Sequence, residues 1–176
     1  MAADEYLALP DDGFRYELVD GVVCKSPSPS WPHQRVVTEI AGQIWEYTSR
    51  RSVGEVAVEV DIFLGSDPVY RPNVVFLCAA KAAQCRERVG VVQDVIVEVV
   101  SPDSRRYDHE TKKHDYEQAG VGEYWVIDPD LGVFTFHRLA GGRFVEASAG
   151  PARFTSQVIA GFELDLESLR KVFPAK

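Results

Sequence analysis

The chain has 176 residues, of which 45% are hydrophobic, 26% charged and 11% aromatic, so intrinsic disorder is excluded as the default state. This length favours a single domain, residues 1–176, with a sizeable buried core. The formal net charge of −8 argues against a broad basic face that grips nucleic acid, although a small cleft with its own local field is compatible with it.

No targeting or membrane segment stands out in the sequence. The start, "MAADEYLALPDDG", lacks a basic region followed by an apolar one, and no apolar stretch approaches the roughly 20 residues that cross a bilayer. Cys24, Cys78 and Cys85 form no CxxC pair and no zinc spacing with the four histidines. We therefore expect a cytoplasmic, reduced protein with no membrane partner.

The N-terminal part predicts a hairpin followed by a helix. In "YELVDGVVCK", residues 16–25, Asp20-Gly21 is a favoured two-residue turn between apolar strands. Ser30 is a suitable N-cap for a helix over residues 33–50. The inward face of this helix shows helical spacing at Val36, Val37, Ile40, Ala41, Ile44 and Tyr47.

The middle of the chain predicts three strands and a short helix. Residues 55–64, "EVAVEVDIFL", alternate strictly and are expected to form one strand with an apolar and a mixed face. The mixed face carries Glu55, Ala57, Glu59, Asp61 and Phe63. Further strands are expected at 71–78 and 94–100, with a short helix at 79–88 between them.

The C-terminal part predicts a helix and then strands. The expected elements are a turn at 101–104, a helix at 108–119, strands at 123–128 and 133–139, a hairpin partner at 141–147 and a short amphipathic helix within 161–173. The order of all elements predicts an α/β (α+β) fold, in which helices pack against a sheet, and excludes an all-β sandwich.

Glu98 is the one charged residue in the apolar run of residues 95–100. On a strand the side chains at 94, 96, 98 and 100 point to one face. A buried carboxylate costs several kcal/mol unless it is paired, hydrogen-bonded or bound to a cation. Three explanations are therefore open: an ion pair with Lys112 or Arg105, protonation, or a metal ion.

The predicted helix at 108–119 offers polar partners on one face. Asp108, Lys112 and Tyr116 follow one another at i, i+4 and i+8, so an acid, an amine and a phenol lie in line. One interpretation is a solvated helix ion pair between Asp108 and Lys112, worth a few tenths of a kcal/mol. The other is that Lys112 leans over Glu98 at the rim of the sheet, where sites are commonly built.

Seven segments, in order, resemble one known family. They are "RYELVDG" (15–21), "SPSPSWPHQRVV" (26–37), "RPNVVF" (71–76), "DVIVEVVSPDS" (94–104), "DHETKKHDY" (108–116), "AGVGEYWVID" (119–128) and "GFELDL" (161–166). Together they are similar to the Uma-two family of restriction-endonuclease-like proteins, a branch of the PD-(D/E)XK nuclease superfamily. The resemblance implies a restriction-endonuclease-like core, a mixed β-sheet flanked by helices, with a metal site at one end.

The resemblance also implies the roles of several residues. In the superfamily, an Asp and a Glu on neighbouring strands hold Mg²⁺, with Mn²⁺ as an alternative, and a Lys stabilises the transition state. Glu98 matches the glutamate, and Lys112 matches the lysine, which the pattern otherwise places two residues after the glutamate, where this chain has Val100. Hard oxygen ligands of this kind suit Mg²⁺.

Two further positions match the family pattern. Glu17 in "YELVDG" would be an additional acid of the metal site. His33 in "SPSPSWPHQ" would be a catalytic residue, or alternatively a residue of the first helical turn bonded to backbone. Tyr116 and Trp125 are expected to support the site, the first by packing the helix on the sheet and the second by filling the core.

Asn73 departs from the family pattern, which reads Pro-Asp where this chain reads Pro72-Asn73. Asn keeps one carbonyl oxygen as a ligand but lacks the negative charge, so a metal would bind more weakly. Asp61, on a nearby predicted strand, is expected either to replace the missing ligand or to be an ordinary polar residue on a half-exposed face.

Two functions follow as hypotheses. The first is a Mg²⁺-dependent endonuclease that hydrolyses DNA phosphodiester bonds, with phosphate contacts from Arg105, Arg106, Lys112 and Lys113. The second is a catalytically inactive nuclease fold, retained for binding or oligomerisation. A hydrolase built on the histidines is not supported, because no nucleophile elbow, metal-spaced histidine pair or phosphate-binding glycine loop is present. The resemblance also implies a homodimer.

Overall fold

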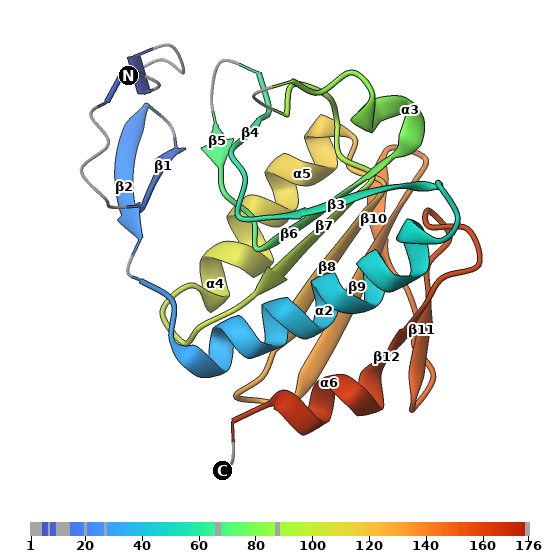
Figure 1. Cartoon of the computed structure of the whole chain (residues 1–176). Helices are drawn as coiled ribbons and strands as arrows, with labels where there is room; N and C mark the ends of the chain where they lie inside the picture. Colours follow the sequence, from blue (N-terminus) through green and yellow to red (C-terminus); the bar gives the residue numbers. More distant parts are fainter. Residues whose placement is uncertain are drawn as a thin grey trace.

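The computed structural model describes residues 5–6, 8–9, 15–19, 21–26, 28–65, 68–86 and 89–174. Its centre is a six-stranded sheet with the order β10-β9-β8-β7-β6-β3 (Figure 1). The strands are β3 Gly54–Val58, β6 Val74–Cys78, β7 Val95–Val99, β8 Glu123–Asp128, β9 Val133–Ala140 and β10 Arg143–Glu146. The pair β7 and β8 is parallel, and the other neighbours are antiparallel, so the sheet is mixed.

A smaller sheet, with the order β2-β1-β5-β4, lies beside the central one. Its strands are β1 Arg15–Val19, β2 Val22–Ser26, β4 Ile62–Phe63 and β5 Val69–Tyr70. The predicted hairpin is thus confirmed; Asp20 of its turn lies outside the described residues, and Gly21 has a φ of 71°. A third pair joins β11 Arg153–Thr155 and β12 Glu163–Asp165, which the sequence had not indicated.

Helices cover both faces of the central sheet (Figure 1). On one face lie α2 Trp31–Ser49 and α6 Leu166–Val172, packed on the strands through a large apolar cluster. On the other face lies a continuous helical segment, formed by α4 Arg105–Tyr107, the π-helical turn η1 Asp108–Lys112 and α5 Lys113–Ala119, with a second apolar cluster. The predicted mixed sheet flanked by helices is therefore confirmed.

The side chains of β7 alternate between these two clusters. Val95, Val97 and Val99 belong to the cluster under α2. Ile96 belongs to the cluster under α5, together with Val100 just after the strand. Glu98 therefore faces the helical segment 105–119, as its parity on the predicted strand requires.

The expectation of one strand at 55–64 is wrong, because this stretch forms two separate strands, β3 and β4. Glu59 adopts a left-handed backbone with a φ of 54°, which a strand does not accommodate. Its N–H donates to the backbone oxygen of Asn73 at 3.3 Å, and the chain then continues into the smaller sheet. Glu59 and Asp61 consequently do not share a strand face.

Two shorter differences concern helices. The helix expected at 79–88 is limited to α3 Ala79–Ala82, and residues 87–88 lie outside the described residues. The segment 161–173 begins with β12 before α6, because Asp165 ends the strand and caps the helix, accepting from the N–H groups of Glu167 and Ser168. Within the part of the chain described here, no helix is both long and apolar enough to span a membrane.

Candidate functional site

A cavity of about 590 Å³ opens between the β1–β2 hairpin, the ends of β6 and β7, and the first turns of the segment 105–112. Its lining includes five of the six residues that the sequence singled out: Glu17, His33, Asn73, Glu98 and Lys112. They come from β1, the first turn of α2, the residue before β6, β7 and η1. Four separate parts of the chain thus build one site together with the hairpin.

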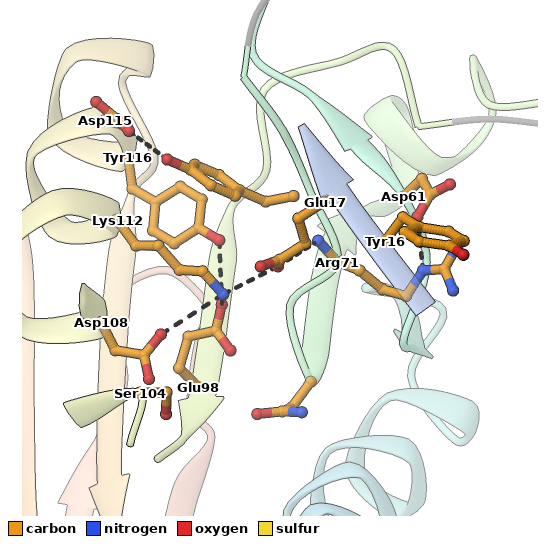
Figure 2. A network of polar contacts seen from close by, with 12 residues as sticks. Tyr16, Glu17, Asp61, Arg71, Glu98, Ser104, Asp108, Lys112, Asp115 and Tyr116 are labelled. Carbon is orange, nitrogen blue, oxygen red and sulfur yellow. Dashed lines mark hydrogen bonds and ion pairs between the residues drawn. The ribbon is translucent and has the colours of Figure 1, made fainter. Parts of the chain in front are cut away.

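The ammonium of Lys112 is the centre of the site (Figure 2). Its Nζ lies 3.0 Å from Oε1 of Glu98, 3.1 Å from Oε1 of Glu17 and 3.5 Å from Oδ1 of Asp108. Tyr116 donates its hydroxyl to the same Oε1 of Glu98 at 3.1 Å. Each of these five side chains belongs to a residue that is 9% exposed or less. Lys112 therefore does lean over Glu98, and its ion pair with Asp108 is buried rather than solvated.

This cluster carries more acid than base. Burial raises the pKa of Glu98 to about 8; the charge of Lys112 opposes that rise, and the charges of Asp108 and Glu17 add to it. Burial also raises the pKa of the Asp108 carboxyl. Burial alone would lower the pKa of Lys112, but the surrounding carboxylates outweigh it and raise that pKa, so the amine stays charged. Among the described side chains, three carboxyl groups therefore face one ammonium.

Asn73 and His33 hold the end of β7 from two sides. Oδ1 of Asn73 accepts the backbone N–H of Val99 at 2.7 Å. Nε2 of His33 lies 2.8 Å from the backbone oxygen of Val99, within hydrogen-bond distance. Both contacts lie one residue beyond Glu98, so they fix where its carboxyl group enters the cavity.

His33 is positioned by the start of α2. Ser30 caps this helix as predicted, with its hydroxyl accepting the N–H of His33 at 3.4 Å. The contact of the imidazole is with a backbone oxygen, which is the second of the two alternatives that the sequence left open. In this structure His33 supports the strand that carries Glu98.

Asp61 is not brought to Glu98. Its Oδ1 accepts from Nε of Arg71 at 2.6 Å, and the pair lies on the far side of β1 from Lys112 in Figure 2. Asp61 is not among the described residues that line the cavity. Arg71 links this pair to the site through its backbone, because its N–H donates to Oε1 of Glu17 at 3.1 Å. Asp61 thus pairs with Arg71 and does not face Glu98.

Asp108 is the site residue that the sequence analysis did not select. Its carboxyl group is buried and faces Lys112 from the preceding helical turn. The turn between them is π-helical, a conformation that widens the helix and is frequent at functional sites. The i, i+4 spacing had indicated the pair, but it did not indicate that the pair is buried against the sheet.

The donor set fits a hard divalent cation in its chemistry. Glu98, Glu17, Asp108 and the amide oxygen of Asn73 are oxygen ligands of the type that Mg²⁺ prefers, and the excess of carboxyl groups over ammonium favours a further cation. Both contacts of Glu98 with Lys112 and Tyr116 use Oε1, so Oε2 takes part in neither. As the side chains lie, no three acidic, His or Cys groups of the described residues converge on a single ion position. The ammonium of Lys112 is the shared neighbour of the acids.

The fold and the site together define a class, a restriction-endonuclease-like α/β protein with an acid–lysine cluster at the edge of its central sheet. A family model described as "Putative restriction endonuclease" and named Uma2 matches residues 3–167. The chain belongs to this Uma2 family.

A solved structure resembles the whole chain. It comes from Anabaena variabilis ATCC 29413 and is described as "a putative nuclease belonging to DUF820". The two structures agree with a TM-score of 0.85 over 99% of each chain, at 17% sequence identity. This likeness shows that the fold is shared. No curated protein matches the chain.

Proposed function

We propose that this protein is a metal-dependent endonuclease that hydrolyses phosphodiester bonds of DNA. The observation that carries the proposal is the buried contact of Lys112 Nζ with Glu98 Oε1 at 3.0 Å. It joins, at the wall of one cavity, the two residues that match the acid and the amine of the nuclease pattern. Membership in the Uma2 family supports the same reaction class.

The residues take the following roles in this proposal. Glu98 and Asn73 would hold Mg²⁺ or Mn²⁺, and Glu17 would be a further acid of the site. When bound, such an ion lowers the pKa of a water molecule and polarises the phosphodiester. Lys112 keeps its positive charge among the carboxyl groups and offsets negative charge that develops on the phosphate. His33 and Tyr116 are positioning residues, because they act through Val99 and Glu98.

Cleavage of supercoiled plasmid in the presence of Mg²⁺ or Mn²⁺ tests this proposal. The native chain is compared with Glu98→Ala, with Asn73→Asp and with Glu110→Ala, a control on the exposed side of the same helical segment. We expect metal-dependent nicking that Glu98→Ala abolishes, Glu110→Ala retains and Asn73→Asp strengthens. Circular dichroism of each variant shows that the fold is kept.

Two other outcomes separate the fold from the activity. If only Asn73→Asp cuts, the architecture supports catalysis, but the native chain lacks a charge at its metal site. If no folded variant cuts, the proposed hydrolysis is wrong and the chain uses a nuclease fold for binding or assembly. The homodimer implied by the family resemblance remains a prediction, which light scattering of the purified chain tests.

A further inference from the structure

The depth of the site constrains what can reach it. The side chains that would contact a phosphodiester, those of Glu98, Lys112 and Asp108, belong to residues that are at most 5% exposed. They lie at the wall of the cavity behind the β1–β2 hairpin, and Glu17 of β1 contacts Lys112 across it at 3.1 Å. A phosphate group must therefore enter the cavity to meet Lys112.

The size of this cavity decides between a double helix and a single strand. A volume of about 590 Å³ corresponds to a cube about 8 Å on a side. A B-DNA duplex is broader than its own major groove, which is about 12 Å wide, so a duplex does not enter a cavity of this size as a whole. Binding sites of about 300–1,000 Å³ hold small molecules, and snug pockets of this kind accept unpaired or extruded nucleotides.

The walls of the cavity also suit an unpaired strand. One aromatic side chain, that of Tyr107, lines it among the described residues, together with the apolar side chains of Val19 and Pro29, whereas the ring of Tyr16 packs on the opposite face of β1. Aromatic side chains stack on bases of any sequence, which is how single strands are bound without base pairing. A paired base has its faces covered by its neighbours and offers no such surface.

The charge around the cavity does not suit a duplex. Among the described residues of its lining, the cations apart from Lys112 are Lys25 and Arg71, and the guanidinium of Arg71 is already paired with Asp61 at 2.6 Å. Duplex binding depends on many phosphate contacts, and this chain has a net charge of −8. Stacking rather than charge therefore supplies the main attraction for a nucleic-acid substrate.

Trp31 extends the stacking surface beyond the cavity. It is the first residue of α2, and its side chain is 78% exposed. Ser30 and His33, which are close to it in sequence, line the cavity, so the backbone of Trp31 lies next to residues of the lining. An exposed indole beside a nucleotide-sized cavity is suited to hold the next base of a strand that enters it.

We propose that the substrate of this site is unpaired single-stranded DNA, with Tyr107 stacking the base inside the cavity and Trp31 stacking a base at its opening. This inference rests on the proposed nuclease function for the choice of DNA, and it goes beyond that function by naming the strand state. Duplex DNA is a substrate only where a strand is locally open.

Fluorescence anisotropy in EDTA tests the inference without cleavage. The full chain is titrated against a labelled single strand of about 12 nucleotides, the matching duplex and the matching RNA strand. Trp31→Ala is compared with Trp45→Ala, a matched control, because Trp45 is also an exposed indole on α2 but lies about four helical turns further from Ser30 and the cavity. We expect the single DNA strand to bind at least tenfold more tightly than the duplex. Trp31→Ala should weaken binding at least about fivefold, and Trp45→Ala should leave it unchanged.

The salt dependence gives an independent readout. With one or two phosphate contacts, the logarithm of the binding constant should fall with the logarithm of salt concentration with a slope of only about −0.7 to −1.4. Equal or tighter binding of the duplex, tighter binding of RNA, or equal losses for both tryptophan variants would overturn the inference. The plasmid assay separates the two proposals. Preferential binding of single strands without any cleavage supports a single-stranded ligand and contradicts the nuclease proposal. Cleavage of duplex DNA without preference for single strands supports the nuclease proposal and contradicts this inference.

Discussion

The side-chain oxygen of Asn73 accepts the backbone N–H of Val99 at 2.7 Å. The residue that departs from the family pattern is therefore a structural tie between the start of β6 and the end of β7, whatever it contributes to a metal. An Asp at this position would accept the same N–H, so the tie alone does not select Asn over Asp.

Asn73→Ala should destabilise the fold. It leaves the nearly buried N–H of Val99 without its acceptor, which typically costs about 1–3 kcal/mol. Urea unfolding measures this loss in the free energy of unfolding. Asn73→Asp should keep this hydrogen bond and therefore most of the stability. If Asn73→Asp loses as much free energy of unfolding as Asn73→Ala in metal-free buffer, charge repulsion outweighs the hydrogen bond.

Asn73→Asp should also make stability depend on divalent metal. A further carboxylate beside Glu98 and Glu17 adds negative charge to a site that already has an excess of acid. A cation that binds the folded state stabilises it in proportion to its affinity. Thermal unfolding in Mg²⁺ and in EDTA should therefore give a larger rise in Tm for Asn73→Asp than for the native chain, and equal rises would contradict this expectation.

Lys112→Met should cost about 3–5 kcal/mol, because it leaves three buried carboxyl groups without their cation. Lys113→Met, one residue further on and only partly buried, is the control and should change stability little. Without the ammonium the folded carboxyl groups hold their protons to higher pH, so the deficit should be larger at pH 8 than at pH 5. A deficit independent of pH would mean that lost packing, not charge, is responsible.

His137 predicts a loss of stability in weak acid. Its ring is 4% exposed and stacks on Tyr124, and burial lowers its pKa to about 4, with Lys113 and His109 adding to the shift and Glu117 opposing it. As the pH falls, His137 binds a proton near pH 6.5 in the unfolded chain but only near pH 4 in the folded chain. The contribution of His137 to the free energy of unfolding is therefore complete above pH 6.5 and is lost between pH 6.5 and 4. We expect about 1–2 kcal/mol after allowance for solvent screening.

Comparison with His137→Phe isolates this contribution, because burial raises the pKa of Glu98 to about 8 and so adds a pH dependence of the opposite sign over an overlapping range. Urea unfolding of both proteins across this pH range gives two profiles. The native profile should fall more steeply with acid than the profile of the variant. Parallel profiles would show that His137 is charged in the folded protein or that its folded pKa is ordinary.

Glu123→Ala should be severely destabilising. This carboxylate is fully buried at the start of β8 and accepts from Nε of Arg138 at 3.1 Å and from the hydroxyl of Ser156 at 2.8 Å. It also accepts the N–H of Gln157 at 2.8 Å and the indole N–H of Trp125 at 3.1 Å. Loss of one partner in such a network typically costs about 3–5 kcal/mol. Glu163→Ala, which breaks an exposed pair with Arg153, should cost less than about 1 kcal/mol by the same urea measurement.

Periodicity was sufficient for the elements that have one buried face. The expected helix at 33–50 is α2 Trp31–Ser49, and the expected strand at 123–128 is β8 to the residue. Parity on β7 placed Glu98 on the same face of the sheet as Ile96 and Val100, and the structure shows that the helix with Lys112 covers this face. These features depend on local sequence and on one hydrophobic pattern.

Features that depend on single backbone angles or distant contacts could not be predicted. Alternation at 55–64 was strict, yet the left-handed Glu59 divides that stretch between two sheets and takes Asp61 away from the site. The contact of Glu17 with Lys112 spans most of the chain, and no local pattern encodes it. Glu123 carried a usable signal, because it is, like Glu98, an acid in an apolar strand, and the same argument would have marked it as buried and paired.

The parallel pairing of β7 with β8 limits where this protein can accept insertions and deletions. Two parallel neighbours need a long connection, and here residues 100–122 form it. The same connection carries Asp108, Lys112 and Tyr116, so the segment that joins β7 to β8 also supplies the amine of the site. Insertions or deletions between residues 105 and 119 would shift strand pairing and chemistry together. Variation in length should therefore be tolerated in the turn at 141–142 between β9 and β10, and not in this crossover.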